Sequence, residues 1–145
     1  MTIILNMAFA LLCTSCLSIM FNTPRKTIFI SGLIGMVGWT AYVIAFQANL
    51  GRVAATFIGA FLVNLLAQIS ARKFKKPVLV YVASGIIPLV PGAVAYESVR
   101  AAAEANYILG LEHATLTFML TGAIVMGMAA SAFVYKGIRK ILRQG

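Results

Sequence analysis

The chain has 145 residues, of which 61% are hydrophobic and 10% are charged, and its formal net charge is +9. Soluble domains have roughly 45–50% apolar and about 25% charged residues, so a soluble domain of this length could not bury so much apolar surface. The basic residues form short clusters between apolar runs instead of a basic and aromatic face, which argues against a nucleic-acid-binding protein. We therefore expect a single transmembrane domain over residues 1–145.

Apolar runs long enough to cross a bilayer divide most of the chain. A helix needs about 20 mostly apolar residues to cross about 30 Å of hydrocarbon. Four stretches satisfy this requirement, at residues 3–21, 27–46, 53–69 and 114–135. A fifth, at residues 78–96, contains Pro88, Pro91 and Gly92. The sequence predicts an all-α, polytopic helix bundle of about five spans, the fourth of which is broken.

The basic residues orient these spans, because Lys and Arg in short loops are retained on the cytoplasmic side. Ten of them follow the first, third and fifth predicted spans: Arg25, Lys26, Arg72, Lys73, Lys75, Lys76, Lys136, Arg139, Lys140 and Arg143. The opposite side has only Arg52 and Arg100, together with all three glutamates. We expect the N-terminus outside and the C-terminus in the cytoplasm. A re-entrant fourth segment would separate the Arg72 cluster from the C-terminal cluster, which the charge rule disfavours.

Residues suited to catalysis or metal binding are scarce. The chain has no Asp and one histidine, His113, for which the sequence suggests no partner. Cys13 and Cys16 have the spacing of a redox or metal pair. They lie in the middle of an apolar helix without His or carboxylate neighbours, so we interpret them as packing residues. We expect no enzymatic activity, no metal and no cofactor.

Two amides and several small residues lie within the predicted spans. Asn64 and Gln68 are one helical turn apart, and both would be costly against lipid. They either form interhelical hydrogen bonds or line a solute path, so both are candidate substrate-binding residues. Small residues recur at helical spacing and predict close helix packing; they are Thr56, Ala60 and Asn64 in one span and Ala123, Gly127 and Ser131 in another.

Charged residues follow the broken span. Glu97, Arg100 and Glu104 have the i, i+3 and i+7 spacing that lets each carboxylate pair with the arginine on one helical face. This pattern is typical of a solvated ladder on the outer side. The alternative is a gate at the mouth of a pathway, formed by Glu97 and Arg100 with the nearby Tyr96.

The break in the fourth predicted span gives the most specific prediction of a binding site. Pro88 and Pro91 cannot donate to the carbonyls of Ser84 and Ile87, so two carbonyls are released. A helix that restarts at Pro91 leaves the amides of Gly92, Ala93 and Val94 without intrahelical acceptors, at the positive end of a helix dipole. Counted from Val78 at 1.5 Å per residue, the break lies near the bilayer midplane. Broken helices whose N-termini face a carboxylate recur in transporters, and a simple proline kink is the alternative.

These residues resemble a known family. Residues 21–24, Phe-Asn-Thr-Pro, the glycines and Trp39 of the second span, and above all residues 87–93, Ile-Pro-Leu-Val-Pro-Gly-Ala, followed by Tyr96, are similar to the bacterial threonine/serine exporter family. The similarity covers nearly the whole chain. It matches the small membrane subunit, which is equivalent to the C-terminal half of the longer single-chain exporters.

The resemblance implies an inner-membrane exporter of small carboxylate solutes: threonine and serine, or a dicarboxylate such as succinate in two-subunit relatives. It also implies that the proton gradient drives export and that a larger companion subunit supplies the other half. Pro88, Pro91, Gly92 and Ala93 are then the candidate solute-binding residues of the break. The alternative function is that of a non-transporting structural subunit of a membrane complex.

Overall fold

The computed structural model describes residues 2–144, which form six α-helices and one short 3-10 helix. In chain order these are α1 (Thr2–Met20), α2 (Arg25–Gln47), α3 (Arg52–Lys73), α4 (Leu79–Ile86), the 3-10 helix η1 (Ile87–Leu89), α5 (Gly92–Ala103) and α6 (Tyr107–Gln144). No strand is present in this part of the chain. The all-α fold class is confirmed.

Short turns with a left-handed residue connect the helices. Asn22, Asn49, Lys75 and Ala105 have φ values of 52°, 58°, 52° and 61°, and Gly51 has a φ of 82°. A residue in this conformation stops the repeating helical hydrogen bonds and reverses the chain, and Asn tolerates it better than most residues. The connections α1–α2, α2–α3, α3–α4 and α5–α6 are therefore tight turns.

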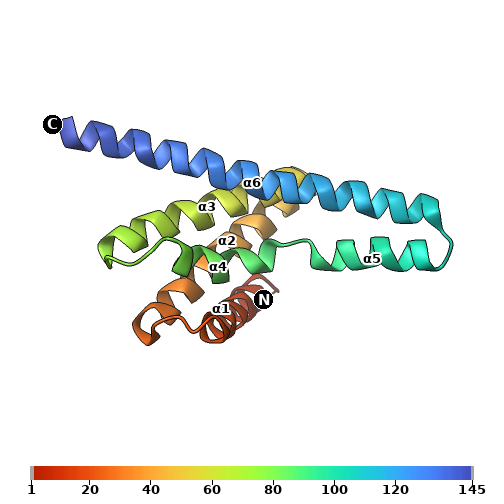
Figure 1. Cartoon of the computed structure of the whole chain (residues 1–145), viewed down its shortest axis with the longest axis horizontal. Coiled ribbons are helices and arrows are strands. Elements are labelled where there is room, and N and C mark those ends of the chain that lie inside the picture. The colour runs from red at the N-terminus through yellow and green to blue at the C-terminus, as the bar shows by residue number, and fades with distance from the viewer. Residues whose placement is uncertain (1, 145) are drawn as a thin grey trace.

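The helices form a bundle from which one hairpin projects. Figure 1 shows α1 to α4 gathered under one half of the long helix α6, while α5 lies antiparallel to the first part of α6. Among the described helices, α6 is the one that packs extensively against α5. The α5–α6 pair therefore extends beyond the rest of the bundle.

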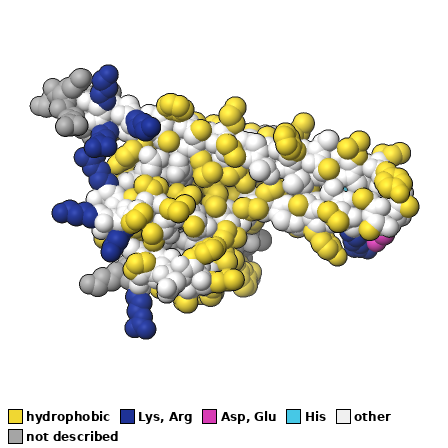
Figure 2. Space-filling model, viewed as in Figure 1, with side chains coloured by type: hydrophobic (Ala, Val, Ile, Leu, Met, Phe, Trp, Pro, Cys, Tyr) yellow, Lys and Arg dark blue, Asp and Glu magenta, His cyan; other side chains and the backbone are white. Residues whose placement is uncertain are grey.

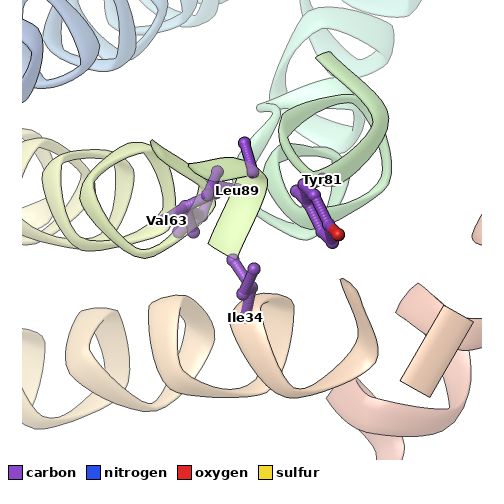
Figure 3. Close-up of a cluster of buried hydrophobic side chains, with 6 residues drawn as sticks. Ile34, Val63, Tyr81 and Leu89 are labelled. Atoms are coloured by element: carbon purple, nitrogen blue, oxygen red, sulfur yellow. The ribbon is translucent and has the colours of Figure 1, made fainter. Parts of the chain in front are cut away.

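The centre of the bundle is a small apolar cluster (Figure 3). Ile34 from α2, Val63 from α3, Tyr81 from α4 and Leu89 from η1 converge there, and all four side chains are buried. This contact fixes the short helix η1, and with it the start of the break, against α2 and α3.

Small residues bring α3 and α6 into close contact. A Cβ atom on Gly127 would lie 2.6 Å from the carbonyl oxygen of Phe57 and 3.2 Å from the Cβ of Ala60. Ala60 and Ser131 are fully buried. The close packing predicted from the small residues of these two spans is confirmed.

Three helical segments are long and apolar enough to cross a membrane: Thr27–Gln47, Arg52–Lys73 and Tyr107–Lys140. The pair Leu79–Leu89 and Gly92–Ala103, bent by 50°, gives a fourth when it is counted as one span. The apolar helix Leu5–Met20 is shorter. A polytopic helix bundle is confirmed, and the crossing of the membrane by α1 stays a prediction.

Basic side chains gather at one end of the molecule, as Figure 2 shows. Arg72 in the last turn of α3 and Lys76 after that helix line the same pocket as Arg139 near the end of α6. The Arg72 cluster and the C-terminal cluster therefore share one side, as in the five-span prediction.

Candidate solute site at the broken helix

The two prolines interrupt the fourth segment where the sequence predicts. After η1, Val90 is extended, with φ −68° and ψ 128°, and α5 restarts at Gly92. Of the two carbonyls expected to be released, that of Ile87 accepts a hydrogen bond from the amide of Val90 at 3.0 Å. The chain thus turns through a 3-10 helix before it breaks, and this recovers one of the bonds that the prolines remove.

The start of α5 has two free amide donors instead of the three predicted. The amide of Gly92 donates to the carbonyl of Val90 at 2.8 Å, and the first bond of the new helix runs from Ala95 to Pro91 at 3.0 Å. Within residues 2–144, the amides of Ala93 and Val94 have no backbone acceptor. Both lie at the positive end of a helix of 12 residues.

A pocket of about 360 Å³ lies against this helix start. Residues 88–94 form one wall, Arg52 and Thr56 of α3 form another, and Leu120 of α6 contributes a further contact. Trp39, Tyr42 and Phe46 of α2 complete the lining. The ring centroids are 5.2 Å apart for Trp39 and Tyr42 and 6.2 Å for Tyr42 and Phe46. Arg52, the two residues with free amides and an aromatic wall therefore line one space.

The break lies closer to one end of the bundle than its depth in the sequence suggests. Leu89 sits at the level of Gly59, because a Cβ atom on that glycine would lie 3.0 Å from a methyl carbon of Leu89. The pocket beside Pro91, however, is lined by Arg52, the first residue of α3. The break thus begins near the middle of α3 and ends in the half toward the α2–α3 turn. Its position near the bilayer midplane stays a prediction.

Arg52 and the aromatic wall are the lining residues that sequence reasoning missed. Arg52 was counted only as one of two basic residues on the outer side. The signal for the wall is the spacing of Trp39, Tyr42 and Phe46, which puts three aromatic rings on one face of α2. The fold brings this face and Arg52 together across the α2–α3 turn.

The two candidate amides have separate environments. The Asn64 amide donates to the carbonyl of Met128 and to the hydroxyl of Ser131, each at 2.7 Å. Of its two interpretations, Asn64 thus has the geometry of an interhelical hydrogen bond. Gln68 lies away from the break and lines a pocket with Arg72 at the basic end.

The charged residues after the break form two separate ion pairs. Arg100 Nε lies 2.9 Å from Glu104 Oε1, with both side chains exposed, which agrees with the expected ladder. Glu97 does not join it: its Oε2 lies 3.7 Å from His113 Nδ1 on α6. The pairing of Glu97 with Arg100 was therefore wrong, and so was the view that His113 has no partner. Tyr96 is 68% exposed and does not line the pocket.

The cysteines and the other potential metal ligands do not form a centre. Cys13 and Cys16 have free thiols with exposed side chains, so their interpretation as packing residues of this chain was wrong. Across the described residues, no three of the His, Cys and Glu side chains lie close enough together to hold a metal ion. The break pocket instead combines the cationic residue Arg52 with residues whose amides have no backbone acceptor.

A family model and two known proteins match most of this chain. Residues 6–134 match the family model described as "Threonine/Serine exporter, ThrE". The chain is 25% identical over 115 residues to the "Threonine/serine exporter" of Corynebacterium glutamicum, covering 79% of this chain and 23% of that protein. It is 29% identical over 117 residues to the "Probable threonine/serine exporter" of Mycobacterium tuberculosis, covering 77% of this chain and 22% of that protein.

No solved structure matches the chain. The family model nevertheless covers most of its length, including α2, α3, the break and α5. The chain belongs to the threonine/serine exporter family.

Proposed function

We propose that this chain is the small subunit of a bacterial inner-membrane exporter of carboxylate solutes, either amino acids such as threonine and serine or a dicarboxylate such as succinate. The solute carboxylate binds in the pocket at the break. Arg52 and the amides of Ala93 and Val94 provide the positive charge and the donors, and Pro88, Pro91 and Gly92 hold the backbone open. The observation that carries the proposal is this grouping of a cation and free amides around one pocket.

The chemistry of the pocket favours a small anion. A carboxylate accepts charge-assisted hydrogen bonds from guanidinium and amide donors, each worth about 1.5–3 kcal/mol. The aromatic wall of Trp39, Tyr42 and Phe46 supplies apolar contact for the rest of the solute. A pocket of about 360 Å³ is at the small end of ligand sites.

A companion subunit completes the proposed exporter. The chain covers 23% and 22% of the lengths of the two relatives, so most of each relative has no counterpart here. The predicted spans have no firmly placed acid or base, and Glu97 is the nearest candidate. Proton coupling needs such groups within the membrane, so we assign it to the companion. The orientation that we propose has the N-terminus outside and the C-terminus in the cytoplasm.

Solute efflux from proteoliposomes tests this function. Vesicles loaded with threonine, serine or succinate would contain this chain, its companion or both, under an imposed proton gradient. We expect gradient-driven efflux only with both proteins. Efflux from vesicles with this chain alone would contradict the proposal that the companion provides proton coupling.

The contribution of the pocket is tested separately with Arg52→Gln. Losing one charge-assisted bond should weaken the apparent solute affinity by about tenfold or more. Arg100→Gln is the matched control, since it removes an exposed arginine that does not line the pocket. Unchanged transport in a correctly assembled Arg52→Gln complex would favour a structural role for this subunit.

A further inference from the structure

A second pocket lies at the opposite, basic end of the molecule. It has a volume of about 280 Å³ between the last turns of α3, the α3–α4 turn and the C-terminal part of α6. It is lined by Gln68, Ala71, Arg72, Lys76, Val78, Tyr135 and Arg139. Neither the proposed solute site nor the predicted topology gives these side chains a binding role.

The three cations of this pocket have no carboxylate to neutralise them. The acidic residues of the chain are Glu97 on α5, Glu104 directly after α5 and Glu112 in the first part of α6. Among the side chains that the structure describes, carboxylates contact basic side chains only at that distant end, Glu104 at Arg100 and Glu97 at His113. Like charges gathered around one small space repel each other, and a bound anion removes that repulsion.

Gln68 provides an independent indication of a ligand. Its Nε2 atom is buried and has no hydrogen-bond acceptor among the described residues. Buried amide donors are nearly always paired, because water no longer solvates them. Gln68 also lines the pocket, so rotation of its side-chain amide toward an oxyanion held there would supply the missing acceptor. One neutral donor and three cations suit an anion with several oxygens, and guanidinium groups match phosphate geometry.

The surroundings of the pocket indicate the source of that anion. On the same two helices, Ile69, Val134 and Ile138 have side chains that are 45–48% exposed. Apolar side chains therefore lie next to a cationic pocket at the end of membrane-crossing helices. A phospholipid fits this pattern, with its phosphate in the pocket and its acyl chains along α3 and α6.

We infer that Arg72, Lys76, Arg139 and Gln68 form a binding site for a phosphate group, presented by an anionic phospholipid of the surrounding leaflet. This site goes beyond the proposed export function. It is separate from the break pocket, so either proposal can fail without the other.

Native mass spectrometry of the full chain in mixed micelles tests the site. The probes are phosphatidylglycerol, phosphatidylcholine and inorganic phosphate. We expect phosphatidylglycerol to remain bound, and the double variant Arg72→Gln/Arg139→Gln to weaken its binding by at least about tenfold. The matched control is Lys136→Gln/Lys140→Gln, which removes the same charge from exposed residues that do not line the pocket. Its binding should stay within about twofold of the unmodified chain, because neither lysine lines the pocket.

The variant Gln68→Leu distinguishes a built site from diffuse attraction. It leaves the net charge unchanged and removes the donor, so it should also weaken binding by about tenfold. If inorganic phosphate binds with the same dependence on Arg72 and Arg139, the phosphate site is supported and its source includes the free anion. Equal losses in the pocket and control variants, or unchanged binding in Gln68→Leu and the arginine double variant, would overturn the proposal.

Discussion

The substitution Gly92→Leu separates a solute site from a proline kink. Gly92 lines the break pocket directly before the free amides of Ala93 and Val94. A Cβ atom added there meets no other part of the described chain within 4 Å, so the packing leaves room for a side chain to start at this position. It occupies the space in which a carboxylate would approach the amides. Only glycine leaves that approach open.

The expected effect follows from the bonds that the leucine blocks. One hydrogen bond to a charged group is worth about 1.5–3 kcal/mol, and about 1.4 kcal/mol corresponds to a factor of ten. Gly92→Leu should therefore weaken the apparent solute affinity by about tenfold to a hundredfold. Transport by the complex with its companion gives this affinity. The fluorescence of Trp39, the single tryptophan of this chain, gives a direct binding readout because it lines the same pocket.

Gly122→Leu is the matched control for this experiment. A Cβ atom on Gly122 also meets nothing within 4 Å, but the residue lies on α6 outside the pocket lining. Its affinity should equal that of the unmodified protein. A Gly92→Leu complex that assembles normally and binds its solute as tightly as this control would refute the amide site.

Three further predictions concern topology and packing. In a background without the two native cysteines, a cysteine at Ala105 should react with an impermeant thiol reagent from outside, and one at Lys75 only after permeabilisation; the reverse pattern would contradict the orientation. Gly127→Leu should greatly reduce folded protein on size-exclusion chromatography, because its Cβ would meet the carbonyl of Phe57 at 2.6 Å. Asn64→Leu removes two hydrogen bonds to α6, so it should lower the thermal midpoint in detergent by an amount equivalent to about 1–2 kcal/mol. Unlike Gly92→Leu, it should not change solute affinity.

Much of the fold was predictable because an apolar run indicates the length of helix that can lie within the lipid. The predicted span at residues 27–46 corresponds to α2, Arg25–Gln47, within a few residues. The last helix was predicted at residues 114–135 and extends from Tyr107 to Gln144. Its ends contain charged residues that lower the hydropathy without breaking backbone hydrogen bonds. The apolar run therefore underestimates the length of this helix.

Only the break itself, which depends on residues close together in the sequence, was predictable within the candidate site. Pro88 and Pro91 predict the break, because neither has an amide hydrogen to donate to the preceding turn. This follows from the sequence alone. The role of Arg52 depends on tertiary structure, because it lies beside the break only after the α2–α3 turn and η1 have packed together. Gln68 shows the same limit. The sequence showed that its amide would be costly against lipid. It did not show that Gln68 lines a basic pocket, whereas Asn64, one helical turn away, forms an interhelical hydrogen bond.

The contact between α3 and α6 also has the geometry of a pivot. Both pockets are lined by these two helices, with Leu120 of α6 at one and Arg139 at the other. Asn64 is hydrogen-bonded to Met128 and Ser131 of α6. Along α6 these two residues lie roughly halfway between Leu120 and Arg139, about 12–16 Å from each at 1.5 Å per residue. A rigid helix that tilts about this point moves its two ends in opposite directions. Any rocking of α6 against α3 would therefore widen the space at one mouth while it narrows the space at the other.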